Sequence, residues 1–424
     1  MANANSIRQG SGLIDPDYRQ DVFPEFAGVT TSVLDCTGRV CVGSAYVSDN
    51  SLETHYAIFR LTNDGQLDRR FGCGGKTTGT FQDGNQSIGY HVIQRPDDGK
   101  FMVLGLTFTG LFPRKPALAR FNSDGTLDTT FANQGHFVIE QPSLEPTPIF
   151  QADHGTELQL SDAGAATPQQ SWQIKPIGDS FIVFGNYYGH DLVVMMFDWE
   201  ANYVTSFNGC GFKYLERQGE GTVYGLALHA DSQSIWVGAC MQTPDFRFRD
   251  AFVVRLTRQG EYDQTFGTAG IADFPELHTL KNVLVLPEDQ RIIGCGAHED
   301  GSGLLVALRQ ADGALDEDFD RVAVKHDGHN IRWDHVLAVS PGAKDSKIIA
   351  AGELRVGVGN LPGVVARFNS DGSLDTFATQ TFTLRRITML AGCTLDTQGR
   401  MLVHGQTQIP ERFNGYVVRL LTQQ

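Results

Sequence analysis

A histidine cluster is the part of this chain whose residue types and spacing most resemble a chemical site. His326 and His329 lie three residues apart, and His335 follows six residues later. Three imidazoles could bind zinc if the connecting loop folds back, and with Asp334 they could form an acid–base cluster. The alternative is a long polar connection between strands whose histidines lie in solvent, because ligand types without controlled spacing are weak evidence.

A second candidate is a calcium loop at Asn122 to Asp128, with the sequence Asn-Ser-Asp-Gly-Thr-Leu-Asp. Such a loop needs a further oxygen ligand two residues before Asn122, where the chain has Arg120. Another copy of the motif has Gln259 where the acidic residue before the glycine belongs. We therefore favour a structural role, in which Asp-Gly makes a turn and the last Asp accepts backbone hydrogen bonds. No cofactor is expected.

The elements that position these residues are predicted by repetition. The motif is clearest in residues 119–131 and 366–377, and an aromatic residue closes each of seven copies. These residues are Tyr18, Phe71, Phe131, Phe207, Phe266, Phe319 and Phe377. A β-rich run ending in glycine recurs with the same count. These glycines are Gly43, Gly105, Gly185, Gly238, Gly296, Gly352 and Gly405. The unit is about sixty residues long, which suits a four-stranded blade.

One unit shows the strand pattern, with apolar, β-branched runs at 283–286, 291–296, 304–308 and 322–325 separated by turns. Seven such units predict an all-β fold, a seven-bladed β-propeller of four-stranded antiparallel blades. Residues 417–424 match a third strand, and residues 10–18 match the part of the repeat after the turn. We therefore expect the N-terminal strand to pair with the C-terminal strand and close the ring. Residues 1–424 should form one domain.

The repeat resembles the delta-60 repeat family of bacterial tandem repeats. The resemblance rests on Arg-Phe-Asn-x-Asp-Gly-x-Leu-Asp-x-x-Phe, seen at 120–131, and on Asp-Gly-Lys-Phe at 98–101. It implies a β-propeller and implies little about function. Two copies depart from the pattern: the third has 197–202 where the Asp-Gly turn belongs, and the sixth lacks one residue before its closing aromatic.

Composition limits the classes of partner. A net charge of −15 argues against binding to nucleic acid and to anionic membranes. No apolar run approaches about twenty residues, so no membrane span is expected. Residues 1–6 are polar and do not resemble a signal peptide. We expect a soluble monomer that is cytoplasmic, or exported without a recognisable N-terminal signal.

The mouth of the central channel is the predicted place for a small ligand, because side chains from separate blades converge there. The residues at or near the starts of the innermost strands are His91, Gln173, Tyr224, Asn282 and His335. The alternative is a polar, water-filled channel without a ligand. An insertion at 140–170 in the third repeat breaks the symmetry of the ring and could bind a partner or cover the channel.

These observations favour a non-enzymatic scaffold that binds a protein through one propeller face. The alternative is a carbohydrate-binding propeller, such as a lectin or a protein of the adhesin or toxin type. A third hypothesis is an enzyme at the channel mouth with His91 or His335 as its base, for which the sequence indicates no substrate.

Overall fold

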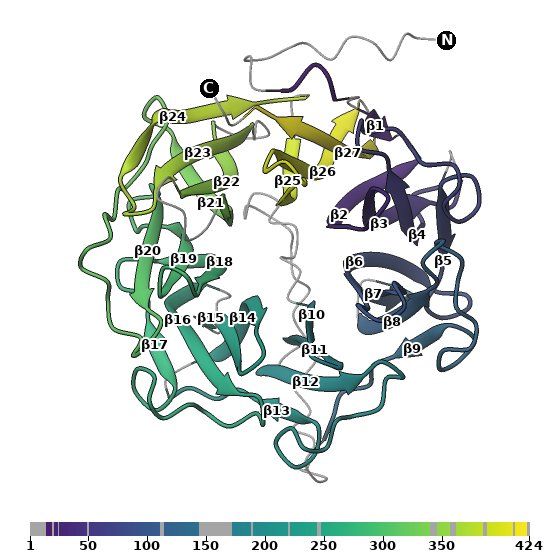
Figure 1. The fold of residues 1–424 in the computed structure, drawn as a ribbon, viewed down its shortest axis with the longest axis horizontal. Helices are drawn as coiled ribbons and strands as arrows, with labels where there is room; N and C mark the ends of the chain where they lie inside the picture. The colour runs from purple at the N-terminus through teal and green to yellow at the C-terminus, as the bar shows by residue number, and fades with distance from the viewer. Residues whose placement is uncertain are drawn as a thin grey trace.

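In the computed structural model, the structure is described for residues 14–18, 21–23, 25–48, 51–110, 114–143, 172–187, 190–218, 221–243, 247–339, 346–356, 362–384, 388–409 and 412–421. These residues form seven antiparallel sheets around one central axis (Figure 1). The predicted seven-bladed β-propeller is therefore confirmed. The described residues contain strands, turns and loops but no helix, and thus no helix that could cross a membrane.

The blades are numbered 1 to 7 along the chain. Blade 1 contains β2 (Phe26–Leu34), β3 (Arg39–Tyr46), β4 (Thr54–Leu61) and β5 (Lys76–Gly79). Blade 2 contains β6 (Gln86–Gln94), β7 (Phe101–Phe108), β8 (Lys115–Phe121) and β9 (His136–Val138). Blade 3 contains β10 (Gln173–Ile177), β11 (Ser180–Asn186), β12 (Leu192–Asp198) and β13 (Phe212–Tyr214). Blade 4 contains β14 (Thr222–Ala230), β15 (Ser234–Gln242), β16 (Phe248–Thr257) and β17 (Ile271–Asp273).

Blade 5 contains β18 (Thr279–Leu286), β19 (Arg291–Ala297) and β20 (Gly303–Arg309). Blade 6 contains β21 (Asn330–Val339), β22 (Lys347–Arg355), β23 (Gly363–Asn369) and β24 (Leu374–Phe382). Blade 7 contains β25 (Thr388–Leu395), β26 (Met401–Ile409), β27 (Arg412–Leu420) and β1 (Asp21–Phe23). In each blade the first strand lies nearest the axis (Figure 1).

Blade 7 closes the ring with strands from both ends of the chain. Its outer strand β1 pairs antiparallel with β27, where Asp21 faces Val417 and Phe23 faces Gly415. The predicted closure is therefore confirmed. Blade 5 departs from the four-stranded plan within the described residues. A single bridge between Gly303 and Val324 replaces its outer strand, because the chain turns back immediately afterwards in a short hairpin.

The core lies between the blades. Within the described residues, seven clusters of buried apolar side chains each join one blade to the next. The second strand of a blade is covered on both faces, and every residue of β7 is buried. This is why the strands appear in the sequence as continuous apolar runs and not as alternating ones.

The recurrent glycine of the second strand faces a β-bulge in the inner strand. Inner strands β2, β6, β14, β18, β21 and β25 all shift register at the corresponding place. A Cβ atom on the glycine of β7, Gly105, would collide with the carbonyl oxygen of Ile88 in β6. The same collision with the inner strand occurs at Gly43, Gly296, Gly352 and Gly405. Because this glycine has no Cβ, it leaves room for the bulge. The bulge changes the direction in which the inner strand's side chains point near the axis.

Candidate functional site

The repeated Arg, Asp and aromatic residues form a buried structural unit. In blade 2 the Nε of Arg120 donates to Asp128 Oδ2 at 2.8 Å, and the guanidinium lies 4.7 Å from the centre of the Phe131 ring. Burial alone would raise the pKa of Asp128, but hydrogen bonds from Lys100 and Thr130 lower it. Equivalent units include Arg60–Asp68–Phe71, Arg255–Asp263–Phe266, Arg291–Asp316–Phe319 and Arg419–Asp15–Tyr18. These conspicuous carboxylates therefore serve the fold.

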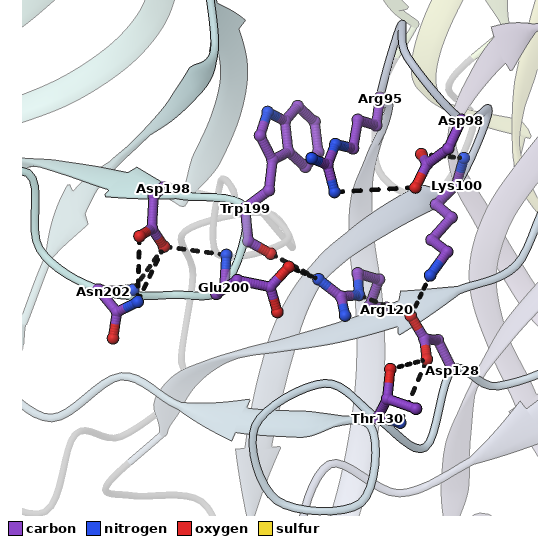
Figure 2. Close-up of polar contacts among 10 residues, drawn as sticks. All are labelled: Arg95, Asp98, Lys100, Arg120, Asp128, Thr130, Asp198, Trp199, Glu200 and Asn202. Carbon is purple, nitrogen blue, oxygen red and sulfur yellow. Dashed lines mark hydrogen bonds and ion pairs between the residues drawn. The ribbon is translucent and has the colours of Figure 1, made fainter.

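The same arginine also joins neighbouring blades. Figure 2 shows Arg120 of blade 2 reaching into the turn of blade 3, where it donates to the Trp199 carbonyl at 2.8 Å and to Glu200 at 2.7 Å. This turn is the departure noted in the third repeat. Asp198 accepts the Glu200 N–H at 2.9 Å, and Ala201 has a positive φ of 63°, where other copies have glycine. The third repeat therefore keeps the turn despite its different sequence. Its side chains change the contact between blades 2 and 3.

The proposed calcium loop directs its oxygens to its own turn. Asp124 Oδ1 accepts the Thr126 N–H at 2.9 Å and the Thr126 hydroxyl at 2.7 Å. Asp128 is bound by Arg120 and Lys100, both at 2.8 Å. Asp124 is thus used within its own turn, and Asp128 is bound by two cationic side chains. Both observations agree with the structural role that we favoured for this loop.

Four of the five predicted channel residues occupy one position of the repeat. His91, Gln173, Asn282 and His335 each pair with the residue directly before the recurrent glycine of the second strand. Tyr224 does not share this position, because it pairs with Cys240, on the other side of the bulge in β14. The structure therefore brings four of the predicted residues into one ring about the axis.

Two of these four are engaged in contacts between blades. The Gln173 side chain of blade 3 donates to the Leu226 carbonyl at 2.8 Å and accepts the Leu228 N–H at 3.0 Å, both in blade 4. His335 forms a hydrogen bond with the backbone of Ala391 in blade 7. His404 of β26, which the sequence did not single out, similarly contacts the Thr30 carbonyl of blade 1 at 3.2 Å.

His91 is a poor candidate for the catalytic base. Burial, and then the nearby Lys175 and His335, lower the pKa of His91 to about 3. A general base works best when its pKa lies near the working pH. This imidazole stays neutral at pH 7 and accepts a proton reluctantly.

The three histidines proposed as metal ligands are not assembled. His326 and His329 face each other across a two-residue turn, with backbone hydrogen bonds of 3.2 and 2.9 Å. His335 instead belongs to β21 at the axis. Among the residues that the structure describes, no three His, Cys, Asp or Glu side chains are placed to hold a metal ion.

Two buried carboxylates share one guanidinium on the inner side of blade 6. Arg332 Nε lies 2.7 Å from Asp334 and its Nη2 lies 3.0 Å from Glu353. Burial, and then Asp334, raise the pKa of Glu353, and burial lowers the pKa of Lys281 in the preceding blade to about 8. Only Asp334 was named from the sequence, because Glu353 comes from another strand.

A hollow on the rim of the ring was not predicted. It has a volume of about 510 Å³ and lies between blades 3 and 4, where Lys213 and Tyr214 of β13 face Tyr262 of blade 4. The remaining lining residues are Asn208, Glu216, Arg217 and Gln218. Lys213 Nζ lies 4.8 Å from the centre of the Tyr262 ring. The lining residues come from separate repeats, so no local sequence motif marks the site.

Comparisons with known proteins support the fold. Residues 97–131 and 343–377 match a family model described as a domain of unknown function (DUF5122) β-propeller. The WD40 domain of Toxoplasma gondii coronin is similar in structure, with a TM-score of 0.50, 8% identity, and coverage of 96% of this chain and 86% of that one. Extracellular domains 1–2 of Drosophila Semaphorin 1a give a TM-score of 0.48 at 8% identity, over 95% and 88% of the chains. A sequence search of curated proteins found no match.

Proposed function

We propose that the protein is a non-enzymatic binding scaffold, and that it engages a protein partner at the hollow between blades 3 and 4. The observation that carries the proposal is the hollow itself. Its volume of about 510 Å³ lies within the range of roughly 300–1,000 Å³ that is usual for ligand sites. It opens beside blade 3, whose turn departs from the repeat. The two stretches that match the propeller family carry the delta-60 motif residues, so we assign the repeats to that type.

The lining chemistry suits recognition by side chains. Tyr214 and Tyr262 are half-buried, and their hydroxyls are held by the carbonyls of Pro142 at 2.8 Å and Glu216 at 3.4 Å. Fixed aromatic rings bind with little loss of conformational entropy. Arg217 is held by Asp273 at 2.7 Å, and tyrosine and arginine are enriched among residues that dominate binding energy. The hollow is thus organised before a partner arrives.

A glycan is the second candidate, because the Tyr262 ring is flanked by amide and carboxylate side chains that could bind hydroxyl groups. Peptide and glycan arrays probed with the purified protein distinguish the two. We expect peptides to bind, Lys213→Glu and Tyr262→Ala to abolish binding, and Arg69→Glu, a charge change at an exposed position of blade 1, to leave it intact. Binding to glycans alone would favour the second candidate. Peptide binding that both hollow variants retain would contradict the proposed site.

A further inference from the structure

The hollow between blades 3 and 4 contains a lysine at a repeat position that is uncharged in other blades. Lys213 lies in β13, the outer strand of blade 3, and follows the closing aromatic residue of its repeat by six positions. The same count leads to Thr77, Phe137 and Ala272 in the outer strands of blades 1, 2 and 4. Blade 3 therefore has a positive charge where these three blades have an uncharged side chain.

The neighbouring joint shows what an apolar residue does at this position. Between blades 2 and 3, Phe137 and Tyr203 both pack against one apolar core cluster. Tyr262 of blade 4 occupies the same repeat position as Tyr203, since each forms a bridge with the end of the third strand of its blade. Opposite Tyr262, however, lies Lys213, with its Nζ 4.8 Å from the centre of the ring. An ammonium group is strongly hydrated, so it does not fill the joint, and a hollow of about 510 Å³ remains.

The ammonium group of Lys213 is held in place but has no acidic partner. Besides the Tyr262 ring, its Nζ contacts Asn208 Oδ1 at 3.5 Å. Among the residues that the structure describes, no Asp or Glu forms an ion pair with it. Lys115 of blade 2, by contrast, is bound by Glu140 at 2.9 Å. Lys213 thus presents an uncompensated positive charge to the hollow.

The guanidinium group of Arg217 adds a further unused donor. Its Nη2 pairs with Asp273 at 2.7 Å, and the group lies 4.3 Å from the centre of the Phe252 ring. Its Nη1 is buried and has no acceptor in the described part of the chain. Among the described lining residues Glu216 is the only acid; its side chain is exposed and forms no ion pair there with either cation. The lining therefore has more cationic donors than acidic acceptors.

We propose that the partner inserts an acidic side chain, Asp or Glu, into this hollow, and that Lys213 binds its carboxylate. This inference rests on the proposed scaffold function and specifies the partner as an acidic peptide segment. A carboxylate accepts charge-assisted hydrogen bonds from an ammonium group. Because the whole chain has a net charge of −15, its surface in general repels such a segment, and the attraction is local to the hollow. Strand β13 pairs on one side only, with β12, and an extended peptide can lie along such an edge.

Matched peptides test the proposal. Decapeptides of random sequence that bind the full-length protein on an array are synthesised again with each Asp or Glu replaced by its amide or by Lys. Fluorescence anisotropy at constant ionic strength then gives their affinities. We expect one acidic residue in each peptide whose amide form binds at least about tenfold more weakly, as for loss of a charge-assisted hydrogen bond. Lys213→Gln should bind the acidic and amide forms equally.

Two further variants separate a role in recognition from a role in folding. Lys213→Glu, which should lose the peptides that the unmodified protein selects, should bind their Lys-substituted forms more tightly than their acidic forms. A structural role of Lys213 would not produce this reversal. The control is Glu216→Gln, at the exposed acid of the same hollow, which should keep the preference for the acidic forms. Thermal unfolding checks that each variant is folded.

The outcomes distinguish this inference from the scaffold function. It is overturned if the binding peptides contain no acidic residue, if their amide forms bind as tightly, or if Lys213→Gln keeps the preference. Peptides that lose binding in Tyr262→Ala but show no acidic preference would overturn this inference and leave the scaffold function standing. Binding of no peptide at all would overturn both.

Discussion

Burial strongly affects the protonation of one histidine, His404 of β26. His404 is 1% exposed, and its Nε2 contacts the Thr30 carbonyl of the neighbouring blade at 3.2 Å. Burial, and then the charges of His335, Arg39 and His91, lower its pKa to about 3. The folded chain thus binds one proton fewer than the unfolded chain at mildly acidic pH. His404 was absent from the sequence predictions, because a histidine in an apolar second strand carries no motif.

The stability of the protein should therefore decline as the pH falls below about 6.5, where an unfolded histidine begins to take up a proton. Between about pH 7.5 and pH 5, His404 alone should reduce the free energy of unfolding by about 2 kcal/mol. Urea denaturation at the two pH values measures this loss. In His404→Gln, which keeps a donor for Thr30 and cannot titrate, the loss should shrink by this amount.

The matched control is His190→Gln, because His190 is exposed on a loop of blade 3. This variant should lose as much stability on acidification as the unmodified protein. An equal loss in the His404 variant would show that other groups cause the acid sensitivity.

Within a blade, the bulge of the inner strand depends on the glycine opposite it in the second strand. The glycine of the second strand has no Cβ, so the carbonyl of the inner strand can approach it, and the extra residue of the bulge is accommodated. At Gly105 the approaching atoms are the Ile88 carbonyl and the ring of Phe81. Both belong to the packed interior, so neither can move away cheaply.

Gly105→Ala should reduce the free energy of unfolding by about 1–3 kcal/mol, the usual cost of overpacking a core. Gly110→Ala provides the comparison, since Gly110 lies just beyond the same strand and a Cβ there meets no atom within 4 Å. That substitution should be nearly neutral. Equal unfolding midpoints for the two variants in urea would show that the bulge does not depend on the glycine.

Elements were more predictable than sites for a physical reason. Turn residues and apolar runs act locally and recur along the chain, with a turn glycine in every repeat but the third, so the blades and their closure could be predicted from the sequence. Gln173 and Asn282 share one repeat position with His91 and His335. Tyr224 lies near the start of its inner strand but outside that ring, on the other side of the bulge. The rim hollow could not be predicted, because Lys213 and Tyr262 meet only through the packing of two blades.

At the scale of the whole molecule, the ring depends on one joint made by the two chain ends. Asp15 receives the Arg419 Nε at 2.7 Å and donates its N–H to the Arg419 carbonyl at 2.9 Å. Both side chains are buried, and the guanidinium lies 4.8 Å from the centre of the Tyr18 ring. The unit that lies within one repeat elsewhere is here divided between the termini, and it holds β1 against β27.

Asp15→Ala should therefore do more than remove an ion pair. It leaves the buried Arg419 without its partner, which costs about 3–5 kcal/mol, and it loosens β1, which exposes the edge of β27. Unpaired strand edges promote association between chains. Asp128→Ala breaks the equivalent pair with Arg120 inside blade 2, where Glu200 still binds the guanidinium at 2.7 Å, and should cost a smaller free energy of unfolding without opening the ring. Size-exclusion chromatography with light scattering should thus show larger species for Asp15→Ala and an unchanged size for Asp128→Ala. If both variants keep the size of the unmodified protein, the pairing of Asp15 with Arg419 is not needed to keep β1 on β27. Closure of the ring by β1 would then not explain why the protein does not associate.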